Sequence, residues 1–67
     1  MYVIQMTVIY PKESRSYTWY FKKKGLFIEC SGLDEAAKFD MKIEAYQVMR
    51  SIGWRNTKTR TVKIVKT

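Results

Sequence analysis

Apolar residues recur with the period of an α-helix in only one stretch of this sequence, whereas in four stretches they alternate with the period of a β-strand. Alternate residues of a strand point to opposite faces of a sheet. In residues 2–10 the more continuously apolar face, which we expect to meet the core, contains Tyr2, Ile4, Met6, Val8 and Tyr10. Pro11 has no N–H to donate to a neighbouring strand, so the strand is predicted to end there.

Three further segments are predicted strands, namely residues 16–22, 26–30 and 60–66. A tight turn is predicted at Lys23-Lys24-Gly25, because glycine tolerates a positive φ. On one face of the second strand we expect three rings to enter the core: Tyr17, Trp19 and Phe21.

The helical period begins at Asp40, which we predict to be the N-cap. One stripe of the helix is apolar and contains Met41, Ala45, Val48, Met49 and Ile52. Gly53 suits a left-handed residue after the helix, and Trp54 would then pack back on the last turn. Before the helix, Ala36–Phe39 fits either a helical turn or an extended connector.

The order β-β-β-α-β predicts one α+β domain over residues 1–67, with a single helix packed on one face of a four-stranded mixed sheet. The third and fourth strands are expected to be parallel and joined by a right-handed crossover. This arrangement places the last strand beside the first, in the spatial order 3-2-1-4. No repeat, low-complexity tract or linker divides the chain.

Basic residues are in large excess and unevenly placed. Thirteen Lys and Arg face six Asp and Glu, a net charge of +7. Five of the six acids lie between Glu29 and Glu44, whereas the chain from Arg50 to its end has six basic residues and no acid. Such an uneven distribution of charge favours a surface that attracts a polyanion or an acidic protein.

Ten residues are aromatic, more than one helix can cover on one face of the sheet. By alternation, Tyr20 and Phe27 are expected to point to the open face of the sheet, and Lys22 and Lys63 to the same face. Rings among cations suit stacked bases and phosphates. Surplus aromatic residues on a small sheet more often stabilise the fold or form a homodimer or other protein interface, where tyrosine and tryptophan are favoured. The chain has no RNA-binding signature such as a GXXG loop.

Residues for catalysis are scarce. The chain has no histidine and one cysteine, Cys30, which argues against a zinc site. Without histidine it also lacks the usual general base near pH 7. Its three glycines are isolated, so no glycine-rich phosphate loop is present. We therefore expect no enzyme activity and no cofactor. No membrane span or signal peptide is apparent, so we expect a cytoplasmic protein.

Three features together resemble a diffuse group of short bacteriophage-encoded β-β-β-α-β proteins, mostly of unknown function. These are the opening Tyr2-Val3-Ile4, the aromatic Trp19-Tyr20-Phe21 before Gly25, and the spacing of Ala37, Phe39 and Ala45. The resemblance implies that Ala36–Phe39 leads into the helix and that Phe39 belongs to the core. It also implies a non-enzymatic inhibitor that binds host machinery such as a defence or transcription complex.

The leading hypothesis is thus a small basic interaction protein, of the phage host-takeover or anti-defence type, which binds a host protein or protein–nucleic-acid complex. The alternative is direct nucleic-acid binding, and a homodimer that buries the open face is a third possibility. The candidate partner-binding residues are Tyr20, Lys22, Lys23, Lys24, Phe27, Arg55, Lys58, Arg60 and Lys63.

Overall fold

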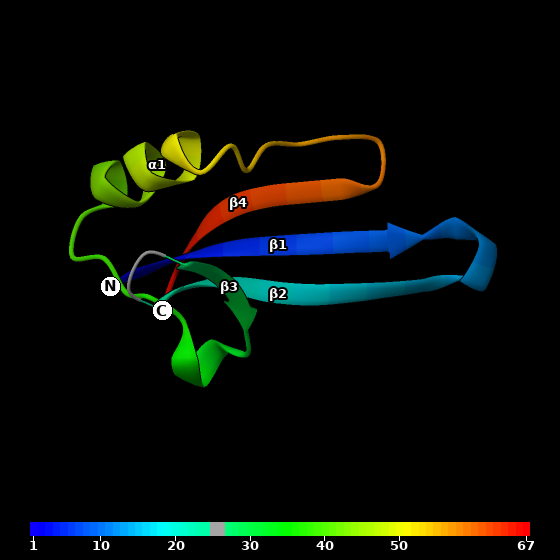
Figure 1. The fold of residues 1–67 in the computed structure, drawn as a ribbon, viewed down its shortest axis with the longest axis horizontal. Helices are drawn as coiled ribbons and strands as arrows, with labels where there is room; N and C mark the ends of the chain where they lie inside the picture. The colour runs from blue at the N-terminus through cyan, green and yellow to red at the C-terminus, as the bar shows by residue number, and fades with distance from the viewer. Residues whose placement is uncertain (25–26) are drawn as a thin grey trace.

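The computed structural model describes the backbone of residues 1–24 and 27–67, and the side chains of residues 1–22 and 32–67 (Figure 1). The predicted turn at Gly25 and the side chain of Cys30 lie outside the described residues. The elements in chain order are β1 (Tyr2–Tyr10), β2 (Arg15–Lys24), β3 (Phe27–Ser31), α1 (Lys42–Ser51) and β4 (Arg60–Lys66). Short 3-10 turns at Pro11–Glu13 and Leu33–Glu35 follow β1 and β3. The α+β class with one helix is confirmed for this part of the chain.

The strands are ordered β3-β2-β1-β4 across the sheet, and every neighbouring pair is antiparallel. The predicted mixed sheet, with parallel third and fourth strands, is therefore wrong. The reason lies in the connector between β3 and α1. Phe39 forms an antiparallel bridge with Tyr2, so the connector runs beside the beginning of β1 in the opposite direction. The helix then runs in the same direction as β1, and β4 has to come back (Figure 1).

The connector before the helix is extended, whereas the sequence of Ala36–Phe39 fitted either an extended connector or a helical turn. Ala36 has φ −62° and ψ 141°, directly after the 3-10 turn. The N–H of Ala37 donates to the Phe21 carbonyl, and Tyr2 and Phe39 exchange two backbone hydrogen bonds of 2.8 Å. The connector is thus joined by hydrogen bonds to both β1 and β2.

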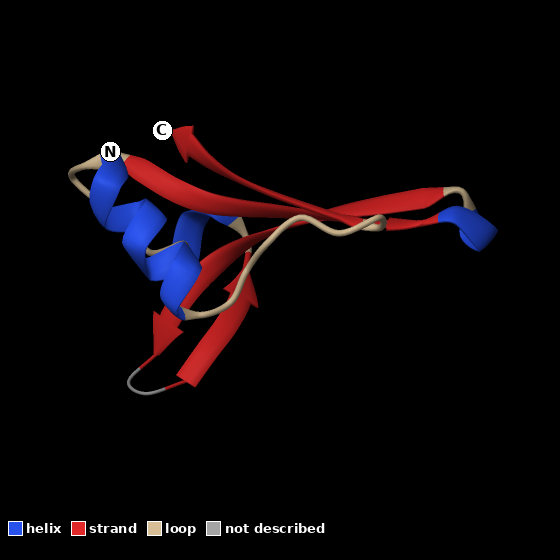
Figure 2. Ribbon diagram, turned by 90° about the horizontal axis from the view of Figure 1, so that it is seen from above, coloured by secondary structure: helices blue, strands red, loops and turns tan. Residues whose placement is uncertain are grey.

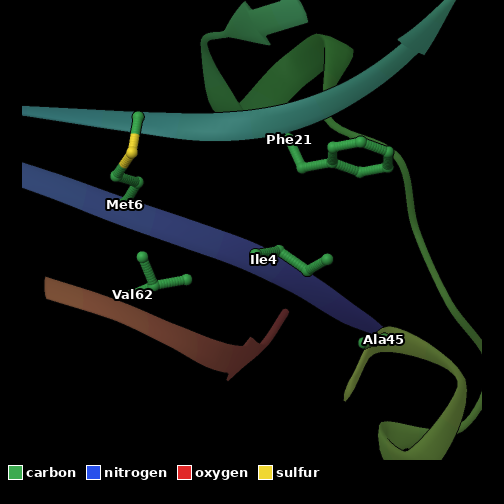
Figure 3. Close-up of a cluster of buried hydrophobic side chains, with 5 residues drawn as sticks. All are labelled: Ile4, Met6, Phe21, Ala45 and Val62. Atoms are coloured by element: carbon green, nitrogen blue, oxygen red, sulfur yellow. The ribbon is translucent and has the colours of Figure 1, made fainter. Parts of the chain in front are cut away.

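The core lies where the helix meets the sheet. Ile4 and Met6 of β1, Phe21 of β2, Val62 of β4 and Ala45 of α1 form its buried cluster (Figure 3). Phe39, as the resemblance implied, packs against this cluster, with its ring 6.4 Å from that of Phe21. Since alanine has the smallest apolar side chain, Ala45 at 0% exposure lets the helix approach the sheet closely.

The two ends of the helix differ in how well the sequence predicted them. The helix begins after Met41, which is its N-cap and makes no side-chain capping bond, so the prediction of Asp40 is wrong. The end is confirmed, since Gly53 has a φ of +77°. The N–H groups of Gly53 and Trp54 donate to the carbonyls of Arg50 and Met49, which is the Schellman arrangement.

The helix is too short to cover the sheet. Ten helical residues span about 15 Å, whereas the nine residues of β1 span about 30 Å. Trp19 and Tyr17 are therefore 42% and 39% exposed, and only Phe21 of the three predicted core rings is buried, at 3%. The prediction that Tyr17 and Trp19 enter the core is wrong for this reason. No helix in the described ranges is long and apolar enough to cross a membrane.

The left-handed Gly53 supplies a test of the helix end. Gly53→Ala should lower the free energy of unfolding by about 1–2 kcal/mol, because a side chain disfavours this conformation. Gly32→Ala is the matched control, since Gly32 has a φ of −70° and its added methyl group would meet nothing within 4 Å. Urea denaturation should show the loss only for Gly53→Ala, and equal losses would contradict the assignment.

Candidate functional site

Part of the sheet projects beyond the helix, and we call residues 7–19 and 59–61 the arm. Figure 2 shows the arm extending away from α1, with the 3-10 turn of Pro11–Glu13 at its tip. It exists because β1 and β2 continue their pairing from Gln5 and Tyr20 to Tyr10 and Arg15. One face of the arm continues the face on which the helix packs, and no helix covers it there.

Three rings are exposed on this face of the arm. Tyr17 and Trp19 lie on it because they alternate with the buried Phe21, and Tyr10 because it alternates with the buried Met6. Tyr10 is 45% exposed. Its ring meets that of Tyr17 edge to face, with centroids 5.5 Å apart. The two tyrosines therefore support each other while both remain accessible.

Arginines accompany these rings. Arg15 pairs with Tyr10 at the end of β2, and Arg60 pairs with Val8 at the start of β4. Arg60 is half-buried and its Nε–H donates to the carbonyl of Arg55 over 3.3 Å. This bond ties the loop after the helix to the arm.

A pocket of about 440 Å³ continues the positive surface toward the helix. It is lined by Arg50, Gly53, Trp54 and Arg55. Trp54 is held in place because its ring packs edge-on against Phe21, with centroids 5.9 Å apart. Arg55 belongs both to this pocket and to the contact with Arg60. We call the combined surface the strip: Tyr10, Arg15, Tyr17, Trp19, Arg50, Trp54, Arg55 and Arg60.

The described acids lie mostly away from the strip. Asp34 and Glu35 belong to the second 3-10 turn, Asp40 to the connector and Glu44 to the first turn of α1, and these segments lie at the end of the molecule opposite the arm tip (Figure 1). Glu35 is paired with Lys22 at 3.0 Å. Of the described acids only Glu13, at the tip, belongs to the arm. The arm and the loop before β4 therefore carry a strong positive charge.

The sheet face opposite the helix is less open than the sequence predicted. Val3 is 0% exposed although it alternates with the buried Ile4 and so points to this face. Tyr20 is half-buried, and its hydroxyl accepts a hydrogen bond of 3.1 Å from the side-chain amide of Gln5. Farther along, the hydroxyls of Thr7 and Thr18 bond each other at 3.3 Å. This face offers small polar groups more than free rings.

The predicted partner-binding residues fall in two places. Arg55 and Arg60 meet in the strip, and Lys58 is exposed in the loop between them. Tyr20, Lys22 and Lys63 lie on the opposite face by alternation. The side chains of Lys23, Lys24 and Phe27 lie outside the described residues. The structure therefore does not bring the predicted set together as one surface.

Sequence reasoning missed the exposed rings and two arginines of the strip. Tyr10, Tyr17 and Trp19 alternate with core residues, so they were assigned to the core. The signal that could have found them is length, because a ten-residue helix covers only about half of a nine-residue strand. Arg15 and Arg50 become functional candidates only through their neighbours in space.

The strip consists of cations and rings, which suit contacts with anionic groups and with flat ring systems. Among the residues that the structure describes, no group of Cys, His, Asp and Glu could hold a metal ion. No protein-family model, no curated protein and no solved structure matches the chain.

The exposure of Trp19 can be tested by fluorescence. The Trp54→Phe variant retains Trp19, which is 42% exposed, whereas Trp19→Phe retains the half-buried Trp54. Acrylamide should quench Trp19 more steeply, and its emission should lie at longer wavelength, because water reaches it more freely. Stronger quenching of Trp54 would contradict the position of Trp19 on the arm.

Proposed function

We propose that this protein binds single-stranded nucleic acid along the strip and catalyses no reaction. The observation that supports this proposal is the occurrence of three exposed rings and two arginines, Arg15 and Arg60, on one face of the arm. Bases of any sequence stack on aromatic rings, while cations contact the phosphates. The binding is therefore expected to depend little on sequence.

The spacing of the rings suits an opened strand. Tyr17 and Trp19 are two residues apart along β2, which corresponds to about 7 Å. Stacked bases follow each other at about 3.4 Å along one strand of a duplex. A nucleic acid that contacts both rings must therefore have its bases spread apart, as proteins that recognise single strands require.

The cations of the strip are arginines and not lysines. This favours nucleic acid over a partner that is attracted by charge alone. The planar guanidinium group both stacks on rings and contacts phosphate with two parallel N–H groups. Arg55 and Arg60 are brought together by the bond of 3.3 Å, so two such groups lie near the rings of the arm. Exposed rings and arginines also suit a protein interface, and the oligonucleotide titration distinguishes the two kinds of partner.

The host-takeover and anti-defence roles that the resemblance implied stay predictions. They are compatible with this proposal, because an inhibitor can act on the nucleic acid that a host machine uses. The proposal itself needs only the strip.

A salt titration tests the proposal directly. A fluorescent single-stranded oligonucleotide should bind with an affinity that falls as salt rises, with a log–log slope of about −3 if about four phosphates are contacted. Fluorescence anisotropy measures both quantities. No binding at about 50 mM salt, where electrostatic attraction is strong, would rule out the proposal and leave an acidic protein as the partner.

Paired variants locate the binding surface. Trp19→Ala should weaken oligonucleotide binding by about 5- to 150-fold, the equivalent of about 1–3 kcal/mol of stacking. Leu33→Ala removes an apolar side chain of similar exposure from the second 3-10 turn, away from the strip, and should have little effect.

Arg15→Ala and Lys63→Ala form the second pair, since each removes one exposed cation, from the strip face and from the opposite face respectively. Only Arg15→Ala should make the salt slope shallower by about 0.7. Equal effects of the two substitutions would indicate general attraction to the whole protein and contradict binding at the strip.

A further inference from the structure

The outer edge of β4 carries backbone groups that point away from the sheet. The N–H of Thr67 donates to the Met1 carbonyl, and the N–H of Ile9 donates to the Thr59 carbonyl. In an antiparallel pair, hydrogen-bonded residues alternate with residues whose backbone groups point outward. The odd-numbered residues of β4 therefore turn toward β1, and Arg60, Val62, Ile64 and Lys66 turn to the outer edge.

The chain itself covers the first half of this edge. The N–H of Thr57 donates to the Arg60 carbonyl at 2.8 Å, and the N–H of Val62 donates to the side-chain oxygen of Asn56 at 2.7 Å. Beyond Val62, β4 is the last strand of the sheet in the described part of the chain. The outward groups of Ile64 and Lys66 thus face no neighbouring strand.

An apolar groove runs beside the uncovered half. Its volume is about 330 Å³, and it is lined by Lys42, Ile43, Tyr46 and Ile64. Ile43 is 53% exposed and Tyr46 is 44% exposed, although both sit on a helix whose other side packs into the core. The groove lies on the helix side of β4, because Ile64 alternates with the buried Val62.

The charges beside this groove indicate what could occupy it. β4 contains Arg60, Lys63 and Lys66 and no acid, and Lys42 stands at the rim of the groove. Two copies pairing edge to edge would bring like charges together, and edge lysines disfavour such pairing. An acidic strand would meet opposite charge instead.

We propose that an extended acidic segment of a partner protein adds to β4 as a further strand. Its backbone would bond the outward groups of Ile64 and Lys66, as in other cases of strand addition. Since side chains alternate, one set of its residues would be apolar and enter the groove, and the other set would be acidic and meet Lys63 on the opposite face. This site shares no residue with the strip, although its Tyr46 ring lies 5.9 Å from the Arg50 guanidinium of the strip, and it goes beyond nucleic-acid binding.

The probe is a short fluorescent peptide that alternates glutamate and valine, and its control contains the same residues in two blocks. The alternating peptide should bind at low salt, and hydrogen exchange should show slower exchange of the Ile64 and Lys66 amides in its presence. Retarded exchange is specific to strand addition, because electrostatic attraction alone forms no backbone bonds. Equal binding of the two peptides, or unchanged exchange, would overturn the proposal.

Two pairs of variants test the groove and the edge separately. Ile43→Glu should weaken peptide binding about tenfold or more, as the loss of a central apolar contact does, whereas Gln47→Glu adds the same charge on the same helix outside the groove lining. Lys66→Pro removes an outward N–H that makes no bond to β1, and Lys66→Ala removes the same charge but keeps that N–H. Only Ile43→Glu and Lys66→Pro should remove most of the peptide binding.

Other occupants would be recognised by their own results. If the Ile64 and Lys66 amides are already protected at high protein concentration without peptide, and sedimentation shows a dimer, the edge pairs with a second copy and the proposal fails. It also fails if an oligonucleotide protects the same amides. Trp19→Ala and Arg15→Ala should leave peptide binding unchanged, so loss of the strip function and loss of the edge function can be told apart.

Discussion

The contact between Ala45 and the β1 face around Ile4 governs the rest of this molecule. Both residues are fully buried, and the rings of Phe39 and Trp54 close around Phe21 beside them. Because the helix has ten residues and is held at this contact, it covers only one end of the sheet. The other end becomes the arm, whose pairing continues without support from a helix. The length of the arm and the exposure of its rings follow from this contact.

The two candidate surfaces have different chemistry and approach each other on α1, where the Arg50 guanidinium of the strip lies 5.9 Å from the centre of the Tyr46 ring of the groove. The strip presents rings and arginines on the uncovered arm, which suits a polyanion with flat bases. The groove between α1 and β4 presents Ile43 and Tyr46 next to a strand edge, which suits an extended peptide. Both surfaces are basic, so acidic ligands are favoured at each. The two proposals together describe a protein that holds a nucleic acid on the arm and a partner segment at the edge of β4.

Much of the fold could be predicted from local patterns, and the failures concern relations between distant segments. Period-two alternation located the strands, and Gly53 located the helix end, because both effects act between near neighbours. The direction of β4 was missed because the bridge between Tyr2 and Phe39 joins residues far apart in the sequence. Of the candidate site residues, Arg55 and Arg60 were foreseen from charge alone. Tyr17 and Trp19 were assigned to the core, because alternation tells which face a residue occupies but not how far the covering helix extends.

The amino-acid sequence by itself determined the class of the protein: a small basic α+β domain with one helix, too many rings for that helix to hide, and few residues suited to catalysis. These properties depend on composition and on contacts between residues close in the chain. Only the tertiary structure decided which rings are exposed, which arginines meet them and which strand edge is left uncovered. Those outcomes depend on where the helix docks and how the connector returns along β1, and both are set by packing between segments that the sequence separates.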